Sequence, residues 1–272
     1  MAAITDAAPV ARTRRSPLRF LGSVSPAFWT LIILLVLWEI AVRITNVPVY
    51  ILPSPSAIAL EFVDYWPRLL INAGVTLSEV LIGFICAIFI GVPLAVLVTY
   101  SRAAERSVYP LIVASQTIPK VAIAPLLLAW FGYGLTPKIV IVVLLSFFPI
   151  VINTVVGLKS SSAEMLYLAQ SMGAGGWQTF WKFRLPQALP YMFAGLKLAT
   201  VLSVIGAVVA EFIGADKGLG YVIVVAGSSF DIARQFAAII MISAIGMIFF
   251  AIIELIEKFV VPWKHAAVIT SE

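Results

Sequence analysis

Few residues in this chain could carry covalent or redox chemistry. The only histidine is His265 and the only cysteine is Cys86, so the chain alone cannot form a histidine-based metal site, a histidine-dependent triad or an intrachain disulfide. Cys86 lies in an apolar run, where a free cysteine is typically a small packing residue. The sequence also has no GxxxxGK[ST] loop for ATP. We therefore expect no catalytic residue, metal or cofactor in this chain, and an energy source on another protein.

Ionisable and amide side chains within apolar segments are the remaining candidates for a function. The segment YPLIVASQTIPKVAIAPLLLAWFGYG contains Gln116 and Lys120 between three prolines. Proline kinks a helix, and an ionisable side chain deep in a membrane is costly unless it faces a cavity or a partner. A kinked, partly polar helix of this kind would suit a translocation pathway. The alternative is that Lys120 lies near the inner interface and reaches a lipid headgroup. The pathway candidates are Gln116, Lys120, Ser203 and Glu211.

Two other classes of membrane protein compete with this interpretation. An ion-coupled secondary transporter or channel uses intramembrane acids and often internal repeats. Glu79 and Glu211 are the only convincing acids, and no repeat is visible. An intramembrane hydrolase would need a histidine in a span or a paired aspartate, and neither is present.

The composition requires that these residues be positioned by membrane-spanning helices. Hydrophobic residues make up 62% of the 272 positions, charged residues only 11%, and the mean hydropathy is +1.07. Backbone polar groups cannot stay unpaired in hydrocarbon, and apolar runs of about 20 residues favour helices over a barrel. We expect an all-α integral membrane protein with six spans. They are predicted at about 27–45, 70–99, 107–131, 137–158, 190–211 and 235–260.

The basic residues predict the orientation of these spans. With the N-terminus inside, eleven of the eighteen Lys and Arg residues fall on the cytoplasmic side and five, including Lys138, fall outside. Arg12, Arg14, Arg15 and Arg19 precede the first apolar run, and a basic start is also typical of a cleaved signal peptide. Because the run is longer than a typical signal-peptide core and lacks an A-x-A cleavage site, we expect an uncleaved first span. We expect a multi-pass protein of the bacterial inner membrane, embedded in lipid and without a nucleic-acid partner. Cytoplasmic tails at 1–24 and 263–272 would flank a membrane domain at 25–262.

Two further patterns concern packing. Gly83, Ala87 and Gly91 repeat every four residues in the second span, as do Ala199, Ser203 and Ala207 in the fifth, and such stripes let helices approach closely in lipid. We expect packing within the subunit; a subunit interface or a wall of the pathway is the alternative. The segment GADKGLGYVIVVAGSSF, after the fifth span, is apolar but too short to cross. It predicts a re-entrant or interfacial helix against the bundle.

The cytoplasmic segment 159–189 reads as a pair of short amphipathic helices. Ser161 and Glu164 fit a capping box at the start of the first helix. Gly173 can end that helix in a left-handed conformation, and Pro186 is expected to stop the second. The first apolar stripe consists of Met165, Leu168, Ala169 and Met172, and the second of Trp177, Phe180, Trp181 and Leu185. Periodicity alone allows these helices either to lie on the membrane surface or to fill a groove on a partner.

The same segment resembles the EAA loop of permease subunits of bacterial ABC importers. Gly173, nine residues, and then FRLP ending at Pro186 match the spacing of that motif, whereas Tyr167, Leu168 and Ala169 replace the initial EAA. The stretches ILPSPSAI, IPKVAIAPLLLAWFGYG and AEFIGADKGLGYVI are similar to the branch for taurine, alkanesulfonates, nitrate and pyrimidine-type compounds.

The resemblance implies a MetI-like, type I importer permease with both termini in the cytoplasm. It implies as partners a second permease copy, two ATPase subunits that hold ATP and Mg, and an external substrate-binding protein. It also implies that the loop is the coupling element docked on the ATPase. The coupling residues would be Glu164, Met165, Leu168, Ala169, Met172, Gly173, Trp177, Phe180, Leu185 and Pro186.

Overall fold

The protein is represented by a computed structural model in which residues 26–263 are described, and the regular elements among them are all helical. Apart from Trp263, the predicted tails, with Arg12, Arg14, Arg15, Arg19 and His265, lie outside these residues. The α-helices are α1 (Pro26–Thr45), α2 (Pro55–Asp64), α3 (Trp66–Tyr100), α4 (Arg102–Ala114), α5 (Lys120–Phe131), α6 (Leu135–Lys159), α7 (Ala163–Ser171), α8 (Gly176–Thr179), α9 (Leu185–Gly214), α10 (Leu219–Ser228) and α11 (Ile232–Val260). A 3₁₀ turn, η2 (Ser115–Thr117), follows α4, and a π-helical turn, η3 (Phe180–Arg184), joins α8 to α9.

Five helical stretches in the described residues are long and apolar enough to cross a membrane, at 28–45, 66–100, 135–159, 176–214 and 232–260. They coincide with five of the six expected spans. The expected third span is not one kinked helix. It consists of α4 with η2 and of α5, which meet at an angle of 98°. Pro119 stands at the N-cap of α5 and lacks the N–H that would continue the first helix.

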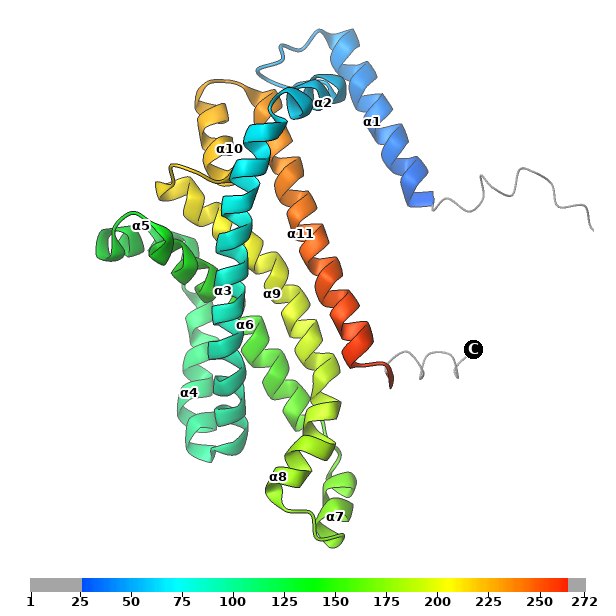
Figure 1. Ribbon diagram of the computed structural model, residues 1–272, viewed down its shortest axis with the longest axis vertical. Helices are drawn as coiled ribbons and strands as arrows, with labels where there is room; N and C mark the ends of the chain where they lie inside the picture. Colours follow the sequence, from blue (N-terminus) through cyan, green and yellow to red (C-terminus); the bar gives the residue numbers. More distant parts are fainter. Residues whose placement is uncertain (1–25, 264–272) are drawn as a thin grey trace, which may run out of the picture.

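The bundle is built around α6, which packs along both α3 and α9, while α11 packs on α9 and α10 (Figure 1). The glycine stripe of α3 lies in close contact with α6. A Cβ atom on Gly83 would lie 2.4 Å from Val142 Cγ1 of α6, and one on Gly91 would lie 3.1 Å from Ile150 Cγ2. Ala87, between them, is fully buried. The predicted stripe is therefore a helix-packing surface within the subunit.

The stripe of α9 has the same role. Ala199, Ser203 and Ala207 are all fully buried. Gly206, beside them, places a hypothetical Cβ 2.9 Å from Val142 Cα. Val142 thus lies between glycines of α3 and α9, and it belongs to the largest apolar cluster among the described residues.

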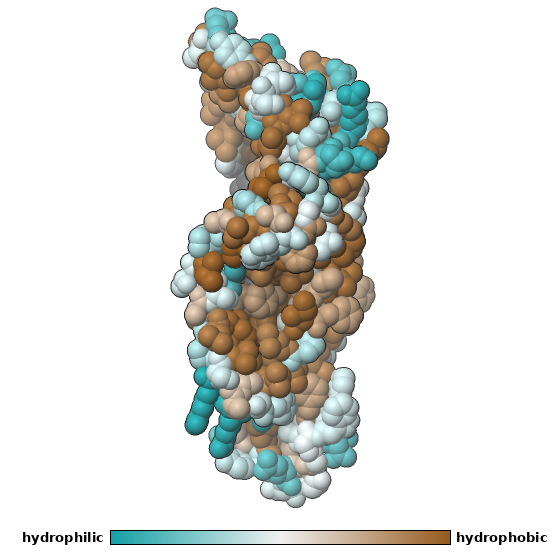
Figure 2. Space-filling view, turned by 90° about the vertical axis from the view of Figure 1, so that its left-hand side faces the viewer, coloured by the Kyte–Doolittle hydropathy of each residue, from teal (hydrophilic) through white to brown (hydrophobic). Residues whose placement is uncertain are grey.

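The two ends of the molecule differ from its middle. Helices α7 and α8 lie at one end of the long axis, and α2 and α10 lie toward the other (Figure 1). The face seen in Figure 2 carries an apolar band across the middle with hydrophilic residues gathered at both ends. This distribution is typical of a protein that spans a bilayer.

Helix α1 stands apart from the bundle and is exposed along most of its length (Figure 1). It is joined to α2 by polar contacts: the Glu39 carboxylate accepts hydrogen bonds from the Ser56 N–H at 3.0 Å and from the Ser56 hydroxyl at 2.8 Å. Arg43 forms an ion pair with the same carboxylate. Because its apolar side chains are uncovered on most sides, α1 is suited to contact lipid or another protein.

Candidate functional site

Helix α7 is fixed at both ends by local hydrogen bonds. Its N-cap is Ser162, whose hydroxyl accepts the Met165 N–H at 3.3 Å, so the cap lies one residue after the predicted Ser161. At the other end, Gly173 has a φ of +78°. The N–H groups of Gly173 and Ala174 bond to the carbonyls of Gln170 and Ala169, which is a Schellman motif. The predicted left-handed turn at Gly173 is present.

The second half of the segment differs from the prediction. Pro186 does not stop a helix, because α8, η3 and α9 form one helical stretch from 176 to 214. Pro186 is the second residue of α9, so its missing N–H falls where the π-helical turn η3 passes into the α-helix. The π-helical turn immediately before Pro186 accommodates the local change in the backbone hydrogen-bonding pattern. The segment is therefore physically continuous with a membrane-spanning helix.

An aromatic cluster surrounds this junction. Phe180 lies 6.0 Å from the ring of Tyr100, at the end of α3, and 5.4 Å from that of Trp181. Trp177 packs on both Phe180 and Trp181, and the Arg184 guanidinium stacks 5.2 Å from the centre of the Tyr100 ring. These contacts fix the start of the 176–214 helix to the end of α3.

The predicted coupling residues divide into anchors and exposed side chains. Ala169 is buried, and the Met165 sulfur accepts a hydrogen bond from Gln187 of α9 at 3.3 Å. Phe180, Leu185 and Pro186 are partly buried, whereas Glu164 and Gly173 are exposed. Leu168, Met172 and Trp177 are 62%, 78% and 73% exposed. Together with exposed Tyr167 and Trp181 they form what we call the α7–α8 apolar patch: Tyr167, Leu168, Met172, Trp177 and Trp181.

The predicted pathway residues do not form one site. Gln116 and Lys120 lie together at the bend between α4 and α5, where the Lys120 ammonium donates to Gln116 Oε1 at 2.7 Å. Lys120 also lies 5.8 Å from the centre of the Phe148 ring on α6. Ser203 is buried and donates to the Thr200 carbonyl within α9. Glu211 belongs to a separate cluster of buried polar side chains.

That buried polar cluster joins α3, α6, α9 and α10. We define it as the buried residues Thr76, Glu79, Lys138 and Glu211 together with Asn72, which is partly buried. The Thr76 hydroxyl donates to Glu211 Oε1 at 2.7 Å, and Lys138 Nζ donates to Glu79 Oε1 at 2.6 Å. Lys138, expected on the external surface, is only 7% exposed. It is buried because its charge is paired with a carboxylate on another helix.

The cluster also caps α10. Three successive N–H groups at the start of α10 donate to side chains of other helices: Gly218 to Asn72 Oδ1 at 2.8 Å, Leu219 to Thr76 Oγ1 at 2.9 Å, and Gly220 to Glu211 Oε2. The predicted helix against the bundle is therefore present and is held by buried polar groups. Sequence reasoning missed Asn72, Thr76 and Lys138. The spacing of Asn72, Thr76 and Glu79 on one face of an apolar helix was the available signal.

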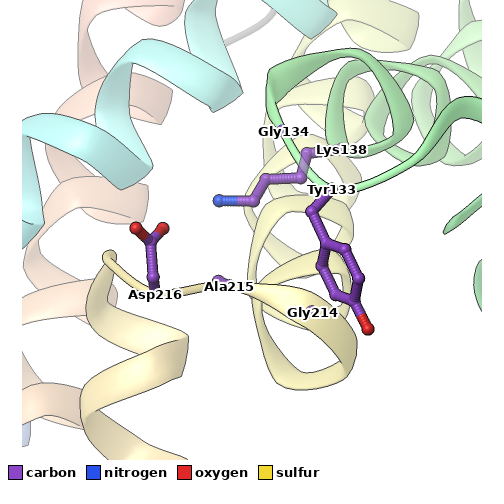
Figure 3. A pocket seen from close by; sticks show the side chains of 6 residues that line it. All are labelled: Tyr133, Gly134, Lys138, Gly214, Ala215 and Asp216. Atoms are coloured by element: carbon purple, nitrogen blue, oxygen red, sulfur yellow. The ribbon is translucent and has the colours of Figure 1, made fainter.

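A cavity of about 490 Å³ lies beside this cluster, between the α5–α6 turn and the α9–α10 turn. Figure 3 shows Lys138 reaching across it from α6, the Asp216 carboxylate facing the same space, and the Tyr133 ring along another wall. The cavity has mixed charge and is not a preformed site for an ion of one sign.

Comparisons with known proteins identify the family. Residues 83–262 match the family described as "Binding-protein-dependent transport system inner membrane component". The chain is 41% identical over 234 residues to the formylaminopyrimidine transport permease protein ThiX of Halalkalibacterium halodurans, covering 86% of this chain and 93% of that protein. It is 37% identical over 242 residues to the riboflavin transport system permease protein RibX of Chloroflexus aurantiacus, covering 86% and 88%. Relatives described as permeases for aliphatic sulfonates, taurine and nitrate are 27% to 30% identical.

The fold has a counterpart among solved structures. A chain of the MetNI methionine ABC transporter in an inward-facing conformation superposes with a TM-score of 0.61 at 19% identity, covering 72% of this chain and 98% of that chain. This likeness confirms the MetI-like helical fold expected from the sequence. The family match, the relatives and the apolar spans together show a multi-pass inner-membrane transport permease. The chain belongs to the family of binding-protein-dependent transport system inner membrane components, the permease subunits of ABC importers.

Proposed function

We propose that this chain forms the translocation pathway of an ATP-driven importer for a small polar solute. Two copies pair in the membrane, and two cytoplasmic ATPase subunits supply ATP and Mg. An external binding protein delivers the solute. Both termini lie in the cytoplasm, and the bent α4–α5 pair counts as the third of six spans. Family membership supports the ATPase and binding-protein partners.

One observation carries the coupling part of this proposal, namely the α7–α8 apolar patch. Its five large side chains are exposed, and they belong to α7, the residue after it, α8 and η3, with α7 and α8 lying at one end of the molecule (Figure 1). Exposed apolar side chains gathered on two helices next to polar residues indicate a protein interface. The spacing from Gly173 to Pro186 favours the ATPase as the partner over a membrane surface.

The helix that follows the patch supports a mechanism of transmission. The stretch 176–214 is helical throughout, and at 1.5 Å per residue its 39 residues extend about 58 Å. Its beginning carries Trp177, and its end carries Glu211 of the buried polar cluster. A displacement of α8 by the ATPase therefore moves the far end of α9. A transporter of this kind alternates between an outward-open and an inward-open state. The ATPase can shift the equilibrium between these states only through contacts that differ between them, and we propose that the α7–α8 apolar patch supplies those contacts.

The relatives narrow the class of solute. Two relatives, 41% and 37% identical, are described as permeases for a formylaminopyrimidine and for riboflavin, which are nitrogen heterocycles. We propose a pyrimidine-type or thiamine-precursor-like solute first, and a sulfonate or nitrate second. Gln116 and Lys120, with an amide and an ammonium beside the Phe148 ring, are suited to contact a polar heterocycle.

A substitution at Gly173 tests the coupling. The left-handed φ of Gly173 disfavours a β-branched residue, while a Cβ there would meet open space. Gly173→Val should leave the assembled complex in the membrane but abolish solute-stimulated ATP hydrolysis. Gly173→Asn is the matched control, because asparagine tolerates this conformation, and it should retain most of the activity.

Two results would contradict the proposal. Normal solute-stimulated ATP hydrolysis in Gly173→Val would show that this segment does not couple the permease to the ATPase. Uptake of the solute into liposomes by the purified chain alone, driven by an ion gradient and without ATPase subunits, would show an ion-coupled transporter instead.

A further inference from the structure

The cavity between the α5–α6 turn and the α9–α10 turn contains an acid and a base that face the same space without pairing. Figure 3 shows Lys138 reaching across the cavity from α6 and the Asp216 carboxylate facing it from the α9–α10 turn. Lys138 forms its ion pair with Glu79 of α3 instead, at 2.6 Å. Asp216 has no hydrogen bond or ion pair with any residue that the structure describes. The cavity therefore places a free acceptor opposite a charged donor.

Hydrogen-bonding capacity remains on both sides of this cavity. An ammonium group carries three N–H donors, and among the described residues Lys138 uses one of them, for Glu79 Oε1. An ionised carboxylate accepts through two oxygens, and Asp216 uses neither with these residues. Lys138 is only 7% exposed, so unused donors there are costly unless a molecule in the cavity accepts them.

An aromatic ring provides a further wall of the cavity. Tyr133 stands between Gly132 and Gly134, whose φ angles of +72° and +146° only glycine adopts readily. The ring runs along the cavity (Figure 3), where a Cβ atom on Gly214 would lie 3.2 Å from Tyr133 Cε1. Tyr133 nevertheless remains 85% exposed. Its uncovered ring is a stacking surface for a planar solute.

The charge and the size of the cavity favour one class of solute. The charge of Lys138 is balanced by Glu79, whereas Asp216 has no basic partner among the described residues, and the neighbouring Lys217 does not line the cavity. A compact anion would be repelled by the Asp216 carboxylate, whereas a group that donates hydrogen bonds is favoured there. The volume of about 490 Å³ lies within the range of about 300–1,000 Å³ that is typical of small-molecule sites.

We infer that this cavity is a binding subsite for a planar nitrogen heterocycle that both donates and accepts hydrogen bonds, of which an aminopyrimidine is the simplest case. The amino group donates to the Asp216 carboxylate, a ring nitrogen accepts from the Lys138 ammonium, and the ring lies against Tyr133. The inference rests on the proposed function, because it adds a second place on the pathway of the same solute. This subsite is separate from Gln116 and Lys120, which lie at the α4–α5 bend.

The subsite connects the solute to the helix that follows the coupling segment. Gly214, which lines the cavity, is the last residue of the helical stretch 176–214. The beginning of that stretch carries Trp177 of the α7–α8 apolar patch. Lys138 belongs to α6, which packs along α9. A solute held by both Lys138 and Asp216 therefore bridges α6 and the α9–α10 turn, so its binding depends on the position of α9.

Saturation-transfer NMR on the assembled importer in lipid nanodiscs, without binding protein, tests the inference. The probe is 4-aminopyrimidine, and its partner probe, 4-methylpyrimidine, has the same ring without the donor. The amino compound should bind, and the methyl compound should bind about tenfold more weakly, since a hydrogen bond to a charged group contributes about a factor of ten or more. Nitrate at the same concentration should not displace the amino compound. Empty nanodiscs give the signal that arises from partition into lipid.

Substitutions at exposed positions test the assigned contacts. Asp216→Ala should weaken binding of 4-aminopyrimidine about tenfold and abolish the difference between the two probes. Asp64→Ala is the matched control, because Asp64 is an exposed acid of α2 that does not line the cavity. Tyr133→Leu should also weaken binding, whereas Tyr133→Phe keeps the ring and should bind as the wild type does. Lys138 is left unchanged, because its removal would leave Glu79 buried without its partner.

Three results would overturn the inference while the proposed function stands. They are no binding of 4-aminopyrimidine by a wild-type complex that hydrolyses ATP on solute delivery, unchanged binding in Asp216→Ala, and displacement of the probe by nitrate, which would indicate an anion site. The proposed function fails instead if ATPase subunits do not co-purify with this chain or if uptake follows an ion gradient without ATP, and the inference then fails with it.

Discussion

Replacing Gly83 by alanine adds one methyl group at the tightest contact between α3 and α6. The new Cβ would lie 2.4 Å from Val142 Cγ1 and 2.5 Å from Val142 Cβ, whereas carbon atoms pack at about 3.5–4.0 Å. Because Val142 Cβ is attached directly to the backbone, no side-chain rotation relieves the overlap. The helices must separate by about 1 Å, and overpacking of this kind typically costs about 1–3 kcal/mol.

The matched control is Gly74→Ala on the same helix, where a Cβ meets no atom within 4 Å. Both substitutions gain about 1 kcal/mol of helix propensity, so this gain cancels in the comparison. The melting temperature of Gly83→Ala should therefore be lower than that of Gly74→Ala, by about 2–4 °C for each kcal/mol of stability that the overlap costs. The assay is thermal unfolding of the purified permease in nanodiscs at one heating rate.

A double substitution separates overlap from other effects. Val142→Ala keeps the Cβ atom that lies 2.5 Å from the new Cβ at position 83. It should therefore restore only part of the stability lost in Gly83→Ala, whereas Val142→Gly should restore more. The coupling energy between Gly83→Ala and Val142→Gly in a double-mutant cycle should be about 0.5–3 kcal/mol, the range for residues in contact. Equal stability of the two alanine variants, or additive effects in the double variant, would refute the packing argument.

Three further predictions concern local hydrogen bonding and helix continuity. Ser162→Ala removes the cap of the Met165 N–H and should destabilise α7 by about 1 kcal/mol, seen as faster hydrogen exchange at Met165, with no change expected in α11. Thr76→Val removes a buried hydroxyl that bonds both to Glu211 and to the Leu219 N–H; it should cost about 1–3 kcal/mol in thermal unfolding, while Thr76→Ser should cost clearly less. Pro186→Ala should leave the helical content by circular dichroism unchanged, because the backbone is already helical there; a gain in helicity would show that the proline interrupts the helix.

The local features of the fold were predictable from the sequence. The apolar runs identified five of the long helices, because a bilayer fixes the length of a span. The small-residue stripes identified the packing surfaces of α3 and α9, and Gly173 identified a left-handed turn, since each depends on residue type within a few positions. The predicted cap, Ser161, is one residue away from the observed cap, Ser162. The two serines offer the same hydroxyl, so residue type alone could not distinguish them.

The features that sequence reasoning missed depend on distant partners. Lys138 at a span end looked like an external charge, but its partner Glu79 lies 59 residues away and draws it into the bundle. Pro186 looked like a helix stop because proline disfavours helix in the residue before it. The π-helical turn before it removes that conflict. The three amides of α10 are capped by side chains of α3 and α9, so no local pattern in α10 itself indicates the cap.

The sharp bend between α4 and α5 has a consequence for how the chain enters the membrane. These helices contain 13 and 12 residues, and a hydrophobic segment needs about 20 to cross alone. The inner side of α5 consists of Ala124 and Leu127, which pack with Ile141 of α6 and Ala210 of α9. Both of those partners are synthesised later than α5. The α4–α5 segment therefore cannot complete its packing before α9 has been synthesised, although it is itself made earlier.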